Sequence, residues 1–336
     1  RDSREALPKR WHFLATIFAV VGLIGCLPAL QSNQLIQIFR DLVMIDQGLL
    51  SANEDPFIFN LLSGTVLAAI TGAVIFGGLH RIAGTARVLV PVMTAVYLVA
   101  VLLALTLNAG AIPSAFSMIL MDAFTGEAAA GGSLLAVVLY GVQRGAYSNE
   151  AGMGTESLVH GAAKTNEPIR EGLVAMIGPI LDTLIVCTAT ALMILIAGTW
   201  QSDASQGVTL TANAFSTLLG PAGTVVVFVC VLCFATTTIF TYSFYGSQCA
   251  SYVFGTKYIN AYRLVFVLSI VLIAVVSIES AVSLIDGSFA LMAIPTMVSA
   301  ILLAPRVLEA AKIYFAKLDA GDDTPKSGGT LDQQPV

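Results

Sequence analysis

Long apolar runs alternate with short polar segments along the whole chain. Each run lasts about 17 to 29 residues, and at a rise of about 1.5 Å per residue roughly 20 helical residues cross the ~30 Å hydrocarbon core of a bilayer. Ten-residue segments of alternating polarity, which are typical of membrane barrels, are absent from the sequence. The pattern predicts an all-α integral membrane protein with eight crossings, at about 11–38, 59–79, 88–108, 113–147, 171–198, 219–247, 262–283 and 288–304.

The composition agrees with a protein whose main partner is the lipid bilayer. Of the 336 residues, 57% are hydrophobic and 11% are charged, whereas soluble domains carry roughly a quarter charged residues. No basic face for nucleic acid is present. The sequence contains no G-x-x-x-x-G-K-[ST] segment for a nucleotide. Any transport is therefore expected to be secondary or channel-like.

Lysine and arginine fall almost entirely on one side of the predicted bundle. With the faces numbered alternately, Arg40 alone of the 16 lies on the second face. Cytoplasmic loops carry such a positive excess, so we expect a plasma (inner) membrane protein with both chain ends in the cytoplasm. Residues 1–318 would form the transmembrane domain, and the polar stretch 319–336 a disordered cytoplasmic tail. The first face holds Arg1, Arg4, Lys9, Arg10, Arg81, Arg87, Arg144, Lys164, Arg170, Lys257, Arg263, Arg306, Lys312, Lys317 and Lys326.

The fourth predicted crossing is irregular. An apolar piece at 113–124 is interrupted near Glu127, and Gly131, Gly132 and Ser133 begin a second piece. Broken helices build solute and ion sites near the bilayer midplane of secondary transporters, so we expect such a site here. Two alternatives remain: the glycines could serve close helix packing, or residues 113–124 could lie along the outer surface.

Three further polar features lie inside apolar runs. Gln31 and Asn33 belong to an amide cluster that suits a zwitterion, because an amide both donates and accepts hydrogen bonds; the alternative is a helix that ends early. Asp182 could be a cation ligand, a proton carrier or a structural acceptor. The threonines of 236–238 offer hard oxygen ligands suited to Na⁺, although such hydroxyls often bond their own helix instead.

The segment 144–154 reads R-G-A-Y-S-N-E-A-G-M-G, which resembles the R-G-x-x-S-N-E-A-G-x-G signature of the alanine or glycine:cation symporters, also called sodium:alanine symporters. Segments 171–176 and 182–188 resemble the next conserved helix of that family, and weaker similarity covers the rest. The resemblance implies an inverted-repeat fold of five plus five helices, with these eight crossings as core helices three to ten. The helices that precede them in the family are expected to be missing.

The resemblance also implies roles for individual positions. Gln31, the stretch Gly131–Ser133 with Ala136 and Val137, and Tyr242 would contact substrate, Tyr242 standing where the family usually has a tryptophan. Thr237 and Thr238 would bind sodium. Asn33, Arg144, Ser148, Asn149, Glu150 and Asp182 are expected to be gate or structural polar residues, and the 148–154 loop is not expected to touch substrate.

The expected function is symport of a small neutral amino acid, alanine or glycine, driven by Na⁺ or H⁺, with sodium as coupling ion and no other cofactor. The chain departs from the family pattern at 154–157, Glu171 and Phe289. A different small solute therefore remains an alternative, as does an inactive, sensor-like or channel-like member. Enzymatic activity is not expected, because the three histidines are scattered and form no ligand spacing.

Overall fold

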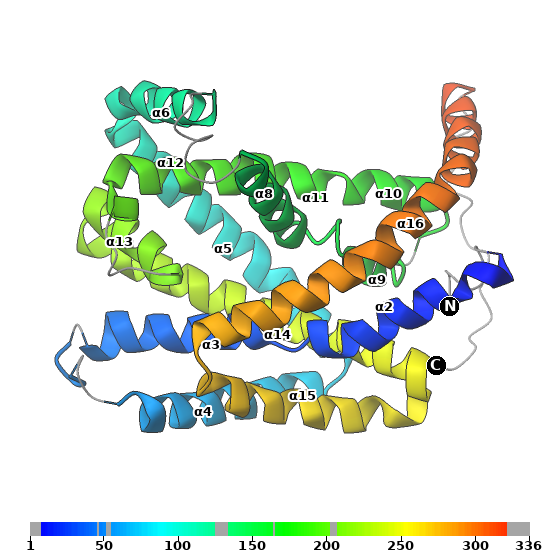
Figure 1. The fold of residues 1–336 in the computed structure, drawn as a ribbon, viewed down its shortest axis with the longest axis horizontal. Helices are drawn as coiled ribbons and strands as arrows, with labels where there is room; N and C mark the ends of the chain where they lie inside the picture. The colour runs from blue at the N-terminus through cyan, green and yellow to red at the C-terminus, as the bar shows by residue number, and fades with distance from the viewer. Residues whose placement is uncertain are drawn as a thin grey trace.

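The computed structural model describes residues 8–45, 47–51, 55–124, 134–163, 165–201 and 207–320, and every regular element in these residues is helical (Figure 1). The all-α prediction is confirmed. The helices are α2 (His12–Gly25), α3 (Ala29–Phe39), α4 (Phe57–Ile75), α5 (Leu79–Leu107), α6 (Ile112–Phe124), α8 (Leu134–Ser148), α9 (Glu156–His160), α10 (Pro168–Ala175), α11 (Ile177–Pro179), α12 (Thr188–Ala197), α13 (Val208–Leu219), α14 (Pro221–Phe254), α15 (Ile259–Ala274) and α16 (Ile278–Asp319), with π-helical η2 (Arg40–Ile45) and η4 (Ile180–Cys187).

Seven helical stretches of the described chain are long and apolar enough to cross a membrane. The fourth predicted crossing is not among them. Its ends form α6 and α8, while 125–133, including the predicted break, lie outside the described residues. The broken-helix prediction therefore stays a prediction.

The last two predicted crossings are divided differently in the structure. We placed them at 262–283 and 288–304, but α15 ends at Ala274 and α16 runs without interruption from Ile278. The hydroxyl of Ser277 caps the start of α16 by accepting a hydrogen bond from the Ser280 backbone N–H. Residues that the sequence pattern placed in a loop, Asp286 among them, therefore lie well inside a long helix.

The first predicted crossing consists of two helices separated by Cys26–Pro28. Pro28 has no backbone N–H and cannot continue the hydrogen-bond ladder of α2. Local bonds close the interruption: the Leu27 N–H donates to the Ile24 carbonyl at 2.9 Å, and the Ser32 hydroxyl donates to the Pro28 carbonyl. The break leaves the start of α3 near the middle of the bundle (Figure 1).

The helix α14 lies at the centre of the fold and packs against α2, α3, α5, α13 and α15. Its segment 242–247 is buried at every position, so this part of the helix has no lipid-facing or solvent-facing side. By contrast, large apolar side chains of α5 and of the α10–α12 stretch are exposed, as expected for helices that face lipid. The best-buried residues therefore surround α14.

The contact between α4 and α15 depends on a missing side chain at Gly64. A Cβ atom there would lie 2.5 Å from the Cβ of Ala274. Gly64→Ala is therefore expected to force the two helices apart and to lower stability by about 1–3 kcal/mol, which thermal unfolding of the protein in detergent would measure as a lower Tm.

Gly84 provides the matched control, because a Cβ there would meet no atom within 4 Å. Alanine in an open helical position is favoured over glycine by about 0.5–1 kcal/mol, so Gly84→Ala should leave the Tm unchanged or raise it. A Gly64→Ala protein as stable as Gly84→Ala would contradict the described α4–α15 packing.

Candidate functional site

A cavity of about 610 Å³ lies between α3, α8, α14 and α16, and we call it the central cavity. This cavity brings several of the predicted site residues together. Gln31, Arg144, Ser148, Glu150, Thr238 and Tyr242, all predicted from the sequence, line it together with Gln34, Tyr140, Tyr147, Glu279, Asp286 and Phe289. Residues as far apart in the sequence as Gln31 and Phe289 thus line the same cavity.

An ion pair joins α8 to α16 at the cavity wall. The two terminal nitrogens of Arg144 donate to the two carboxylate oxygens of Asp286 at 3.0 and 2.9 Å, the bidentate geometry that makes such pairs directional. The Tyr140 ring lies 4.6 Å from the guanidinium carbon, and the Tyr147 hydroxyl donates to the Asp286 backbone carbonyl at 3.2 Å. The pair therefore fixes the position of α8 against α16.

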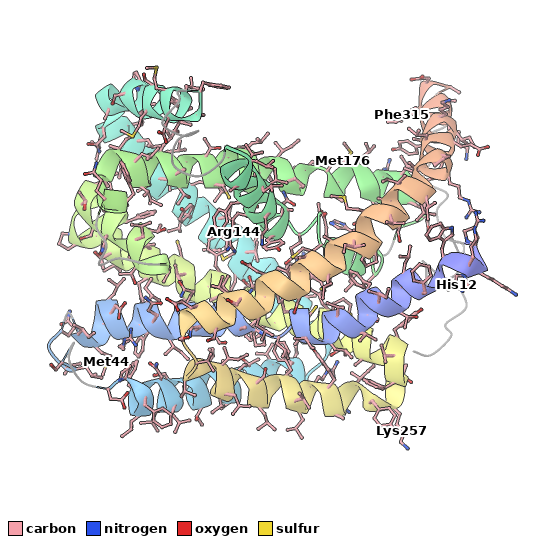
Figure 2. The ribbon with its side chains drawn as sticks, in the orientation of Figure 1. His12, Met44, Arg144, Met176, Lys257 and Phe315 are labelled. Carbon is pink, nitrogen blue, oxygen red and sulfur yellow. The ribbon has the colours of Figure 1, made fainter. Side chains whose placement is uncertain are left out.

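This arrangement corrects the placement of Arg144. We counted it among the charges of a cytoplasmic face, whereas Figure 2 shows it near the middle of the long axis, far from His12 and Lys257 at one end and from Met44 at the other. Asp286 provides its counter-charge. Arg144 is thus a charge of the cavity and not a loop charge.

Glu150 occupies the turn that follows α8. Its backbone has φ of 60°, in the left-handed region that residues other than glycine seldom adopt. The Thr155 hydroxyl donates to its carboxylate at 2.9 Å, and the hydroxyls of Tyr242 and Tyr245 lie close enough to lower its pKa. Burial raises the pKa of the Glu150 carboxyl above its ordinary value, while these hydroxyls lower it.

The 148–154 loop contributes two residues to the central cavity, Ser148 and Glu150. Our expectation that this loop does not touch substrate stays a prediction. The rest of the loop packs inward: Met153 is fully buried, and its carbonyl accepts a hydrogen bond from the Thr296 hydroxyl of α16 at 2.9 Å. The loop is therefore part of the cavity and also a connection to α16.

The glutamines of α3 face the cavity in two different ways. The side-chain oxygen of Gln31 is buried and has no hydrogen-bond partner among the described residues. The side-chain oxygen of Gln34 accepts the N–H of Val208 at 2.8 Å and so holds the start of α13. Because a buried amide oxygen without a partner is costly, Gln31 is the group in this wall best prepared to receive a donor or a cation.

The α14 wall contributes hydroxyl groups. Thr237 is buried and donates to the Cys233 carbonyl at 2.7 Å, the bond to its own helix that we had weighed as an alternative. Thr238 lies on the cavity wall, and its hydroxyl makes no hydrogen bond to any residue that the structure describes. A hydroxyl that donates its proton still has oxygen lone pairs for a cation, so both threonines keep ligand capacity.

Asp182 connects two segments and does not line the central cavity. It lies in the π-helical η4 and accepts a hydrogen bond from the Ser148 hydroxyl at 2.5 Å. One residue further along each segment, the Asn149 amide donates to the Thr183 hydroxyl at 3.1 Å. These two contacts join the end of α8 to η4 and favour the structural reading of Asp182 among the three that the sequence left open.

The remaining predicted positions fall elsewhere. Asn33 donates from its amide to the Val276 carbonyl at 2.9 Å, beside the connection between α15 and α16, and is not on the cavity wall. Ala136 is exposed on α8. Gly131, Gly132 and Ser133 lie outside the described residues, as does the side chain of Val137.

Sequence reasoning missed Asp286 because we placed it in a loop. Read as part of one apolar helix from 278 onward, it would have been an intramembrane carboxylate, which is by default a candidate functional residue. A search for its partner would then have pointed to Arg144. Gln34 belongs to the same amide cluster as Gln31 and so had a signal in the sequence, whereas Tyr140 and Tyr147 had none comparable.

Comparison with known proteins gives consistent matches. The model of the sodium:alanine symporter family matches residues 3–327. The chain is 38% identical to the sodium/alanine symporter AgcS of Methanococcus maripaludis over 257 residues, or 76% of this chain and 56% of that protein. It is 33% identical to an uncharacterized transporter of Haemophilus influenzae over 320 residues (92% and 66%) and 30% identical to the probable sodium/glutamine symporter GlnT of Bacillus subtilis over 324 residues (95% and 64%). The chain thus spans between 56% and 66% of the length of these relatives.

The ion pair predicts a specific pattern of stabilities. Asp286→Asn leaves the Arg144 guanidinium without a counter-charge, and because the two side chains are 25% and 36% exposed, solvent reduces the cost to about 1–2 kcal/mol. We expect a lower Tm in detergent for Asp286→Asn and for Arg144→Gln alone.

The double variant Arg144→Gln with Asp286→Asn should be less stable than the parent by less than the sum of the two single losses, because neither charge is left alone. Strictly additive losses would show that the two side chains do not interact in the folded protein.

Proposed function

The chain belongs to the sodium:alanine symporter family, and from this premise we propose that it serves the symport of a small neutral amino acid with Na⁺ or H⁺. Membership of a transporter family, together with seven candidate spans among the described residues, makes it a multi-pass membrane protein. Because the chain covers less than two thirds of its relatives' length, transport is proposed for the protein in which this chain functions.

The amino acid would bind in the central cavity, and the observation that supports this most strongly is the Gln31 side-chain oxygen. That oxygen is buried and has no partner among the described residues, on a helix whose start lies beside a break at Cys26–Pro28. An ammonium group would supply the missing donor. In this proposal Tyr242 closes the cavity from α14, and Gly131–Ser133, Ala136 and Val137 complete the contacts from the segment before and within α8.

Sodium would bind next to the same cavity at Thr237 and Thr238. Neutral hydroxyl oxygens are hard ligands, which suit Na⁺ by the logic that holds for other hard cations. The two residues are adjacent on α14, where Thr237 is buried and Thr238 lies on the cavity wall. Binding of the ion and the amino acid at neighbouring sites would give the coupling that symport needs.

Access from the two sides would alternate by rocking of helices around the cavity. We propose that the described helices form core helices three to ten of the inverted-repeat fold, with residues 1–318 as the transmembrane domain and 319–336 as a disordered tail. The cytoplasmic side would be the end that holds His12 and Lys257, opposite Met44 (Figure 2), because the positive charges of the predicted loops fall there. Asn33, Arg144, Ser148, Asn149, Glu150 and Asp182 would hold or gate the cavity.

The volume of the cavity constrains the choice of amino acid less than the side chains of its wall do. A volume of about 610 Å³ exceeds what alanine or glycine needs, and the relatives include proteins named for alanine and for glutamine. Phe289 and Tyr147 form an edge-on aromatic pair in the wall, with ring centres 5.0 Å apart. We propose alanine or glycine first and a larger neutral amino acid second.

Gln31→Ala tests the amino acid site. In vesicles that contain the full protein, we expect Na⁺-driven uptake of labelled alanine, and a loss of at least about tenfold in apparent affinity for Gln31→Ala, because a hydrogen bond to a charged group is worth about 1.5–3 kcal/mol. The matched control is Gln37→Ala, since Gln37 lies on the same helix but off the cavity wall, where it bonds Gln34 and Thr209. Equal effects of the two substitutions would contradict the site, and binding without accumulation would indicate the sensor or channel alternative.

Thr238→Val tests the sodium site. The substitution keeps the shape of the side chain and removes its oxygen, so we expect the Na⁺ concentration for half-maximal uptake to rise about tenfold while uptake at saturating Na⁺ is retained. Thr236→Val is the control, because the Thr236 hydroxyl donates to the Leu232 carbonyl at 2.6 Å and is not on the cavity wall. A Thr238→Val protein with unchanged sodium dependence would exclude this residue as a ligand.

A further inference from the structure

Glu150 is a carboxylate inside the protein that no positive side chain among the described residues neutralises. Its contacts are the hydroxyls of Thr155, Tyr242 and Tyr245. Some of the residue's surface stays open to the central cavity, while the carboxylate itself is packed among these groups. None of the ion pairs in the described part of the chain includes Glu150. The same cavity contains an Arg144 whose charge is already matched by Asp286.

A carboxylate without a counter-charge in such surroundings is costly, and the usual outcome is that it binds a proton or a cation. The three hydroxyls make both states possible at Glu150. When the carboxylate is ionised they donate to it, and when it is protonated one hydroxyl oxygen can accept the new O–H, because each has lone pairs to spare. The side chain need not move for the proton to be exchanged.

The backbone holds Glu150 in place at a cost. Its φ of 60° makes it the one residue other than glycine with positive φ in the described chain. The turn is also tight, since a Cβ on Gly152 would lie 2.6 Å from the Cβ of Ala146. Residues kept in this conformation cluster at functional sites. The strained backbone of Glu150 therefore indicates a functional role for its carboxylate.

Other titratable groups surround Glu150 on every side. The charge of Glu156, at the start of α9, raises the pKa of Glu150. The groups facing it or sharing its cavity are Tyr242 and Tyr245 of α14, Cys26 of the α2–α3 break, Arg144 and Tyr147 of α8, and Glu279 and Asp286 of α16.

We propose that Glu150 is a proton-binding site of the central cavity, with its carboxyl group taking a proton from the cavity and returning it there. A cation that enters the cavity, whether Na⁺ or the ammonium of an amino acid, favours the ionised carboxylate and so releases the proton, and by linkage a bound proton weakens cation binding. Burial raises the pKa of the Glu150 carboxyl and so favours its protonated form, which agrees with a proton-binding role. The proposal rests on the proposed function, because it names a residue that would bind H⁺ during symport. Its first measurement does not require transport.

The test is an infrared pH titration of the full protein in lipid, without Na⁺ or amino acid. We expect a protonated carboxyl band whose midpoint lies above the ordinary Glu value of about 4.3. Glu150→Gln should abolish that band. Glu156→Gln, the matched control at the start of α9, should retain it with a slightly lower midpoint, since the Glu156 charge is one of the groups that raise it.

A second variant decides the matter even where Glu150→Gln does not fold. Tyr245→Phe removes a hydrogen bond to the ionised carboxylate, so the midpoint should rise by about one pH unit. In the parent protein, saturating Na⁺ or alanine should shift the midpoint downward. A band that Glu150→Gln leaves unchanged, or a midpoint at the ordinary value that Tyr245→Phe does not move, would overturn the proposal whatever the outcome of the uptake measurements.

Discussion

Inside an apolar bundle, each backbone and polar side-chain group needs a partner within the protein, because neither lipid nor neighbouring apolar side chains can supply one. Most of the described chain meets this requirement by regular helices. The exceptions have local causes: Pro28 interrupts the first crossing, and η4 widens into a π-helix beside Pro179. The buried amide oxygen of Gln31 is one of five buried side-chain atoms without a partner among the described residues, and it is the one that belongs to a residue lining the central cavity. The cavity wall thus contains a polar group that can still gain a hydrogen bond.

Four charged residues line the cavity, and two of them form a pair. Arg144 and Asp286 satisfy each other and join two helices, so their contribution is to position the wall. Glu150 and Glu279 belong to no ion pair among the described residues, and Glu150 has hydroxyl partners instead, so its charge is open to change. A cavity that contains a fixed pair and a variable charge at Glu150 can respond to a positively charged ligand without losing its shape. This division follows from contacts and not from the identity of the transported solute.

The class of the protein could be predicted well from the sequence and the site less so. The lengths of the apolar runs gave most of the helices, and the segment 144–154 gave the family. The segmentation failed at 283–288, where polar residues suggested a loop and a continuous helix is found. That error concealed Asp286, and with it the partner of Arg144. The resemblance to the family brought Gln31, Thr238, Tyr242 and Glu150 forward, and the fold places all four around one cavity.

What the sequence by itself determined is the helical membrane class and the family, because hydrophobic length and local spacing are properties of contiguous residues. Only the tertiary structure decided which polar groups face one another. Arg144 and Asp286 are 142 residues apart, and Glu150 meets two tyrosines of α14 that no spacing rule connects to it. Such pairings depend on how helices cross and turn against each other. That packing is set by the sum of many side-chain contacts, so no single stretch of the sequence reveals it.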